Sequence, residues 1–249
     1  ASRTFAATPL TAFEVFDEQS PTQIVFGDFG GAGATWRDVV YVDGGPDVRV
    51  VRNPNGGVLV PETCNIGGDV RALTTGDLND DGLDEVIVLT QVGEIRVMAG
   101  TASGCGTVTV VLDDVPIQTP QLFIGHFDGD TLPDVLVARR EQASQSADQT
   151  GAMLWHGAAD MVTQPRWSEV ILEGTARQIA PFPHASGQAA DLVAVAGRRE
   201  QDAVAWVPFQ DGRYRTAYPL QVTHGNGTVE RHDGGLNAAY VVDVDGDGH

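Results

Sequence analysis

The sequence predicts an all-β fold built from repeated four-stranded units, and three features support this. Asp outnumbers Glu by 24 to 10, and there are 30 Gly and 13 Pro, residues that favour turns over helix interiors. Short Val-rich runs bounded by Gly, Asp, Asn or Pro recur along the chain, as expected of strands. No segment sustains an apolar period of about 3.6 residues, so no amphipathic helix is predicted.

The strands can be located from these apolar runs and from the turns between them. Gly-rich connections suited to hairpins occupy residues 52–57 and 98–107. In chain order, the predicted strands are 23–26, 38–42, 48–52, 58–60, 86–90, 94–98, 107–112, 135–138, 192–196 and 203–207.

The charge of the chain argues against one class of partner. There are 34 acidic and 15 basic side chains, a formal net charge of -19, and every basic residue is Arg. Because affinity for nucleic acid depends on clustered Lys and Arg, we expect no nucleic-acid partner. The absence of Lys excludes Schiff-base and Walker-type lysine chemistry. No apolar run approaches about 18 residues, so no membrane span is expected.

Acidic clusters recur at a regular interval. The clearest is Gly-Asp-Leu-Asn-Asp-Asp-Gly at residues 76–82, followed by an apolar strand. The first positions of the clusters fall at 28, 77, 126, 183 and 243, which gives steps of 49, 49, 57 and 60. A period of about 50 residues with roughly four strands per unit is the length of a propeller blade. We therefore expect a β-propeller of four-stranded blades, each about 50 to 60 residues long.

The repeat also predicts how residues 1–249 are organised as a single propeller domain. Four full repeats and a truncated fifth do not make an obviously closed ring, and a complete ring would have about seven blades. The expectation is therefore an incomplete propeller, part of a longer chain or completed by a partner subunit. The predicted parts are N-terminal strands in 1–22, repeats at about 23–70, 71–120, 121–178 and 179–237, and a truncated repeat at 238–249.

The acidic loop at 77–85 has the donors of a Ca²⁺ site. Three oxygen-bearing side chains alternate along it and converge if the loop curls, and a closing acid and a main-chain carbonyl add further oxygens. Without a cation, two carboxylates about 4 Å apart repel by about 4 kcal/mol at an effective dielectric of about 20. The alternative is a tight β-turn that needs no metal. The predicted ligands are Asp77, Asn79, Asp81, Leu83 and Glu85.

This pattern resembles the FG-GAP or VCBS repeat of integrin alpha-subunit propellers and of many secreted bacterial proteins. The resemblance covers most of the chain, from about Gln23 to His249, and implies Ca²⁺ in the loop between the first and second strands of each blade. His126 and Pro183 depart from the pattern. Asp128, Asp130 and Asp134 match its ligand positions in another loop, and the half-motif at the C-terminus supplies Asp243, Asp245 and Asp247.

The loops between second and third strands would lie on the face opposite the metal loops. Two of them begin with Arg-Arg-Glu-Gln, and Arg pairs well with carboxylate, sulfate or phosphate, so we expect a protein or acidic glycan ligand there. The alternative is that these are solvated residues paired with neighbouring Glu. Trp155 and Trp206 follow the same loops as a candidate sugar-stacking platform, or else they pack between blades. The candidate arginines are Arg139, Arg140, Arg198 and Arg199.

These features predict a Ca²⁺-stabilised binding or interaction module, secreted or on the cell surface (extracellular or periplasmic), without catalysis of its own. Two alternatives stay open: the propeller scaffold of a carbohydrate-active lyase or dehydratase, and a structural subunit of a larger extracellular assembly. No residue set nominates a reaction. Two cysteines, Cys64 and Cys105, are too few for a disulfide scaffold and lack the spacing of a zinc site. They form either one disulfide or two buried thiols.

Overall fold

Strands make up every regular element that the structure describes. The computed structural model describes residues 21–29, 38–52, 61–113, 115, 121–138, 150–158, 160–172, 176–182, 191–198, 201–207, 209–210, 213–214, 218–219, 221–223 and 229–231. No helix occurs in these ranges. The all-β prediction is therefore confirmed for this part of the chain.

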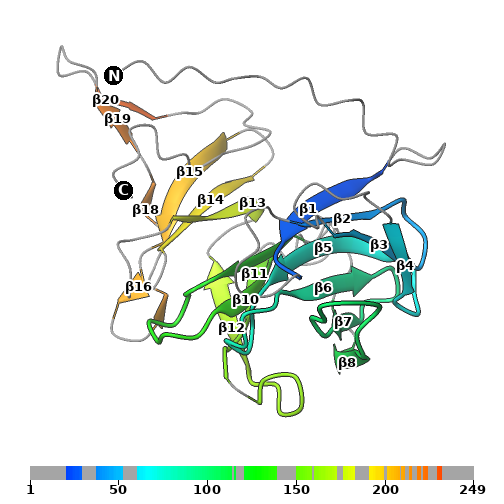
Figure 1. Ribbon diagram of the computed structural model, residues 1–249. Helices are drawn as coiled ribbons and strands as arrows, with labels where there is room; N and C mark the ends of the chain where they lie inside the picture. The colour runs from blue at the N-terminus through cyan, green and yellow to red at the C-terminus, as the bar shows by residue number, and fades with distance from the viewer. Residues whose placement is uncertain are drawn as a thin grey trace, which may run out of the picture.

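Four antiparallel sheets of four strands follow one another along the sequence (Figure 1). The first sheet contains β1 (Gln23–Gly27), β2 (Asp38–Val42), β3 (Asp47–Val51) and β4 (Pro61–Asn65). The second contains β5 (Val70–Gly76), β6 (Glu85–Thr90), β7 (Ile95–Met98) and β8 (Val108–Leu112). The third contains β9 (Gln121–Gly125), β10 (Asp134–Ala138), β11 (Thr150–Trp155) and β12 (Trp167–Leu172). The fourth contains β13 (Ala176–Phe182), β14 (Asp191–Arg198), β15 (Gln201–Val207) and β18 (Tyr218–Pro219).

The remaining strands form two small ribbons near the end of the described chain. The bounds of their strands are β16 (Phe209–Gln210) with β17 (Arg213–Tyr214), and β19 (Gln221–Thr223) with β20 (Val229–Arg231).

The first strands of consecutive sheets lie side by side. Strand β1 contacts β5, β5 contacts β9, and β9 contacts β13, so neighbouring sheets meet along their first strands (Figure 1). Within each of the first three sheets, every strand pairs with the next one in the sequence. In the part of the chain that the structure describes, these sheets do not close into a ring.

The second sheet is covered on both faces, which explains the continuous apolar run of β6. Successive residues of a strand point to opposite faces. Val86 and Val88 pack into a core shared with the first sheet, whereas Ile87 and Leu89 pack into a core shared with the third. All six residues of β6 are consequently buried. A strand that lies between two neighbouring sheets cannot show the polar and apolar alternation of a half-exposed strand.

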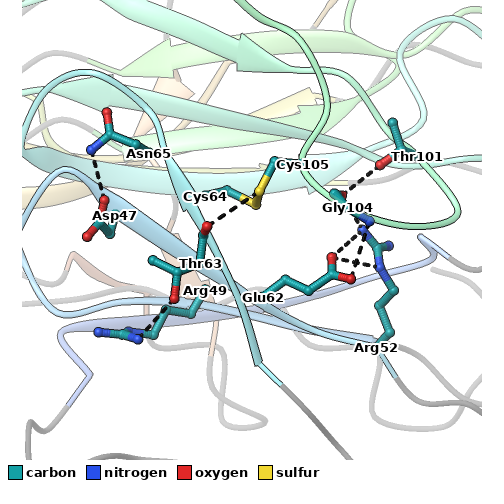
Figure 2. Close-up of a disulfide and its surroundings, with 10 residues drawn as sticks. All are labelled: Asp47, Arg49, Arg52, Glu62, Thr63, Cys64, Asn65, Thr101, Gly104 and Cys105. Carbon is teal, nitrogen blue, oxygen red and sulfur yellow. Dashed lines mark hydrogen bonds and ion pairs between the residues drawn. A yellow bond between two sulfur atoms is a disulfide. The ribbon is translucent and has the colours of Figure 1, made fainter.

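A disulfide joins the first sheet to the second. Cys64 in β4 and Cys105 in the connection from β7 to β8 are bonded, and their Cα atoms are 5.5 Å apart (Figure 2). Of the two states that the sequence left open, one disulfide or two buried thiols, the structure therefore has the disulfide. Beside the disulfide, the Arg52 guanidinium forms an ion pair with Glu62 and donates to the carbonyl oxygen of Gly104 over 2.8 Å. The first two sheets are thus joined covalently and by polar contacts at the same edge.

Some strands differ from their predicted positions. The strand predicted at 58–60 lies outside the described residues, and the fourth strand of the first sheet instead spans Pro61–Asn65. The fourth sheet begins at Ala176, before the predicted repeat boundary at 179. Strands β5, β9, β11, β12 and β13 were not predicted; in β5, the exposed Arg71 and the half-exposed Thr74 and Thr75 interrupt the apolar run. The predicted segments 1–22 and 238–249 lie almost wholly outside the described residues.

Candidate metal centre

The acidic loops lie where the sequence predicts, between the first and second strands of a sheet. Residues 77–84 connect β5 to β6, and residues 126–133 connect β9 to β10. The loops of the first two sheets share one edge: the N–H of Asp28 donates to the Asp84 carboxylate over 2.8 Å, and the N–H of Asp84 donates to the Asp28 carbonyl over 2.8 Å. The first two sheets therefore present their loops side by side.

Each of the first three sheets buries an acid at the first position of its second strand. Asp38, Glu85 and Asp134 are 2%, 3% and 0% exposed. Each carboxylate accepts a hydrogen bond from the backbone N–H of a buried apolar residue near the start of the loop. The three bonds run from Phe29 to Asp38 (2.9 Å), from Leu78 to Glu85 (2.8 Å) and from Phe127 to Asp134 (2.7 Å).

These bonds explain why the loops curl. The apolar residue that follows the first loop position is anchored in the core, and the buried acid fixes its backbone. Phe29, Leu78 and Phe127 are at most 2% exposed, although each lies in a loop and directly follows a polar residue. A buried carboxylate needs such partners, because an ionised group loses its hydration when it leaves water. The closing acids therefore have a structural role in addition to any role as ligands.

In the second sheet, the alternating side chains point into the loop. The Asp77 carboxylate accepts the N–H groups of Asp81 and Gly82 over 3.1 and 2.8 Å. The Asn79 side-chain oxygen also accepts from Asp81, and the Asp81 carboxylate accepts from Leu83. Gly82 has a φ of 85°, a left-handed conformation that side-chain-bearing residues rarely adopt. The predicted curl of this loop is present, with oxygen atoms on its inner side.

The loop of the second sheet, residues 77–84, is called the second loop, and the corresponding loop of the third sheet, residues 126–133, the third loop. The acids of the second loop lie close to the buried carboxylate of Glu85. Burial raises the pKa of Glu85 to about 7; the N–H groups of Leu78 and Gly100 lower this pKa, and the charges of Asp81 and Asp77 raise it. Ionised Glu85 is thus unfavourable, chiefly because the carboxylate is buried and further because the charges of Asp81 and Asp77 repel it. A divalent cation bound between them would remove this repulsion and favour the ionised form.

A compact group of candidate ligands occurs in the third sheet. The candidate ligand atoms of Asp128, Asp134 and His156 all lie within 4.8 Å of one another. Within the described ranges, no other trio of acidic, Cys or His side chains comes this close, so Asp77, Asp81 and Glu85 do not form such a group. This part of the structure could therefore bind a metal ion.

His156 enters the group from another strand, and sequence reasoning missed it. It directly follows β11, and its Nδ1 atom lies 2.8 Å from the Asp128 carboxylate. Its Nε2 atom lies 2.7 Å from the hydroxyl of Ser168 in β12. The next residue, Gly157, donates its N–H to Asp134 over 2.7 Å. The end of the third strand thus completes the site that the loop begins.

Two glycines allow the end of the third strand to approach the acidic loop. A Cβ atom on Gly157 would lie 2.6 Å from the Pro133 carbonyl oxygen, and one on Gly100 would lie 2.7 Å from the Asp84 carbonyl oxygen. Both contacts are closer than real Cβ atoms approach. Gly100 and Gly157 each occupy the second position after the third strand of their sheet. A Gly at this position was the available sequence signal for the approach.

The electrostatics of the third loop resemble those of the second. Asp134 is fully buried, and burial raises its pKa to about 6, while the N–H groups of Gly157, Phe127 and Asp128 lower it. The Asp128 charge raises this pKa further. Asp130, also a predicted ligand, is exposed and accepts the N–H of Leu132. The structure therefore brings together two of the three predicted acids of this loop.

Trp155 lies in the core and not on a ligand-binding surface. It is 0% exposed, stacks on Trp167 with ring centroids 5.4 Å apart, and donates its indole N–H to the Met161 carbonyl oxygen. Of the two roles considered for it, the structure shows packing. Trp155 pairs with Val135, the second residue of β10, whereas Trp206 pairs with Val193, the third residue of β14. The two Trp residues therefore do not occupy equivalent positions in their sheets.

Several other predicted site residues cannot be placed. Arg139, Arg140 and Arg199 lie outside the described residues, as do Asp243, Asp245 and Asp247. Arg198 ends β14, and its side chain, like that of Trp206, lies outside what the structure describes. The predicted arginine cluster therefore stays a prediction.

Comparison with known proteins does not assign the chain to a family. No protein-family model matches it, and no curated protein is significantly similar to it. The resemblance to FG-GAP repeats therefore rests on the sequence motifs. In the described part of the chain, no helix is long and apolar enough to cross a membrane.

Proposed function

We propose that this protein is a Ca²⁺-stabilised β-propeller module that binds an extracellular protein or carbohydrate. The observation that carries the proposal is the loop at 77–85, whose alternating side-chain oxygens turn inward beside a buried acid. Such an arrangement concentrates hard oxygen donors, the ligands that Ca²⁺ prefers.

The propeller assignment is supported by how the sheets follow one another. The second sheet packs its two faces against the first and third sheets, and the first strands of successive sheets are adjacent. In a propeller the first strands of all blades surround a common axis. The similar position of the acidic loop in three successive sheets, together with the FG-GAP resemblance, favours equivalent blades.

The residues of the second loop are of the types that bind Ca²⁺, and the carboxylates of Asp77, Asp81 and Glu85 would move closer together to share one ion. Asp77, Asn79, Asp81 and Glu85 would supply side-chain oxygens, and Leu83 would supply its carbonyl oxygen. When bound, the ion supplies positive charge and links the loop to the start of β6. If free Ca²⁺ is about ten times the dissociation constant, one site adds about 1.4 kcal/mol to stability.

An extracellular location agrees with the covalent chemistry of the chain. Disulfides persist in oxidising compartments and are rare where thioredoxin and glutathione keep thiols reduced. The Cys64–Cys105 bond is therefore typical of a secreted or surface protein. Millimolar extracellular Ca²⁺ would also suffice for a loop of moderate affinity.

The proposed ligand face lies opposite the metal loops. In an antiparallel sheet, the connections from first to second strands and from second to third strands lie at opposite ends. The latter connections contain the repeated Arg-Arg-Glu-Gln segments that begin at Arg139 and Arg198. Arg on an acidic protein would attract a carboxylate- or sulfate-bearing partner and pair with it.

Thermal unfolding with and without Ca²⁺ tests the metal part of the proposal. Chelation should lower the Tm, Ca²⁺ should restore it, and Asp81→Asn should abolish the difference. Asp80→Asn is the matched control, because Asp80 is an exposed acid of the same loop and Asn also tolerates its φ of 59°. Equal Tm values with and without Ca²⁺ would refute the metal role.

Binding to acidic polysaccharides and to neutral glycans tests the ligand part. Retention on a sulfated or uronate-rich polysaccharide, lost when the four candidate arginines are changed to Gln, would support an anionic ligand. Release of unsaturated products from such a polysaccharide would instead favour the lyase alternative. The four positions are Arg139, Arg140, Arg198 and Arg199.

A further inference from the structure

We infer that the third loop is a separate metal site for a cation that accepts nitrogen ligands, such as Zn²⁺, with Asp128, Asp134 and His156 as its protein ligands. The inference deepens the proposed function, since it assumes that the acidic loops take cations, and it assigns the second and third loops to different ions.

The three ligands converge from different parts of the third sheet. Asp128 belongs to the loop after β9, Asp134 begins β10, and His156 follows β11. Their candidate ligand atoms lie within 4.8 Å of one another. Ligands that share one Zn²⁺ at about 2.0–2.2 Å lie roughly 3 to 3.5 Å apart, so only small side-chain movements are needed.

The histidine ring is held in the orientation that a metal ligand requires. With Nδ1 facing the carboxylates, Nε2 lies 2.7 Å from the Ser168 hydroxyl oxygen. Metal-binding histidines generally donate their second ring N–H to such a partner, which fixes the ring and the tautomer. If Zn²⁺ is bound, Nε2–H would donate to Ser168, and the Nδ1 lone pair would coordinate the ion in place of the Nδ1 contact with Asp128.

The same loop has lost features that favour Ca²⁺. His126 replaces the first acid, and its Nδ1 atom lies 3.2 Å from the Leu132 carbonyl oxygen, the atom that corresponds to the Leu83 carbonyl of the second loop. The His126 ring thus engages the Leu132 carbonyl oxygen. The closing acid is the shorter Asp134 instead of Glu85. One hard oxygen ligand is therefore missing, and a second, the Leu132 carbonyl oxygen, is engaged by His126.

A nitrogen ligand from His156 in place of an oxygen ligand favours Zn²⁺ over Ca²⁺ at this site. Ca²⁺ takes six to eight oxygen ligands, whereas Zn²⁺ binds imidazole strongly and needs only about four ligands. Two carboxylates and one imidazole supply three of these. Asp128 and His156 have side chains that are 22% and 28% exposed, so water can supply the fourth. The paired carboxylates also neutralise a divalent charge.

Calorimetric titration of the full metal-free chain with Zn²⁺ and, separately, with Ca²⁺ tests the inference. We expect His156→Gln to weaken Zn²⁺ binding by at least about tenfold and to leave the Ca²⁺-induced rise in Tm unchanged. His126→Gln is the matched control in the same loop and should leave Zn²⁺ affinity within about threefold. Equal Zn²⁺ affinity in wild type and His156→Gln, or equal losses in both variants, would overturn the inference.

A second measurement guards against a variant that fails to fold. In wild-type protein, Zn²⁺ should shift the imidazole ¹⁵N resonance of His156 Nδ1, whereas Ca²⁺ should not; no shift with Zn²⁺ would also overturn the inference. The Asp81→Asn variant separates the two proposals. If it loses the Ca²⁺ effect and keeps Zn²⁺ binding, both stand. If wild type responds to Zn²⁺ alone, the Ca²⁺ proposal fails and the third-loop site stands.

Discussion

Replacing Glu85 by Gln should remove a large pH dependence from the stability of the metal-free protein. The pKa of Glu85 is about 7 in the fold and 4.5 by ordinary values, so the folded state binds more protons between these pH values. The contribution of Glu85 to the free energy of unfolding is therefore fully present below about pH 4.5 and is lost as the pH rises through about 7. The pKa difference corresponds to roughly 3 kcal/mol.

Urea unfolding at pH 4.5 and pH 8 in the presence of a chelator measures this effect. The fall in unfolding free energy between these pH values should be roughly 3 kcal/mol smaller in Glu85→Gln than in wild type. Part of the fall should persist, because burial also raises the pKa of Asp134 to about 6. Asp80→Asn removes an exposed charge from the same loop and should change little. An identical pH dependence in wild type and Glu85→Gln would show that buried Glu85 does not titrate as argued.

Two further predictions concern the packing of the sheets. Changing both Cys64 and Cys105 to Ala should lower the unfolding free energy by about 4 kcal/mol, because the bond closes a loop over a sequence separation of 41 residues; chemical denaturation checks this, and a loss below about 1 kcal/mol would contradict it. Gly157→Ala should destabilise by about 1–3 kcal/mol, because its Cβ would clash with backbone. Gly45→Ala, where the nearest contact is 3.4 Å, is its control, and equal melting temperatures for both variants would refute the close approach.

The sequence predicts strands well where a strand is apolar throughout. Residues 86–90 read as a strand and form most of β6, because the neighbouring sheets bury both of its faces. In β5 the exposed Arg71 and the half-exposed Thr74 and Thr75 break the apolar run. Such a strand is recognised from its pairing with β6, and pairing is not visible in a local pattern.

The position of the acidic loops could be predicted, but the composition of the third site could not. Asp128 and Asp134 lie in a spaced motif, whereas His156 is 28 residues from Asp128 and reaches it only through the antiparallel pairing of β10 with β11. The disulfide posed the same difficulty. Cys64 and Cys105 belong to different sheets, so only the packing of those sheets could decide that they pair.

Anomalous scattering from crystals grown with Ca²⁺ tests the central claim most directly. The account predicts a Ca²⁺ peak in the second loop, about 2.3–2.6 Å from oxygen atoms of Asp77, Asn79 and Asp81. A loop that keeps the same curl without a peak, at Ca²⁺ concentrations well above those outside cells, would show that its carboxylates serve only as turn-forming acceptors. That result would contradict the assignment of this protein as a Ca²⁺-stabilised module.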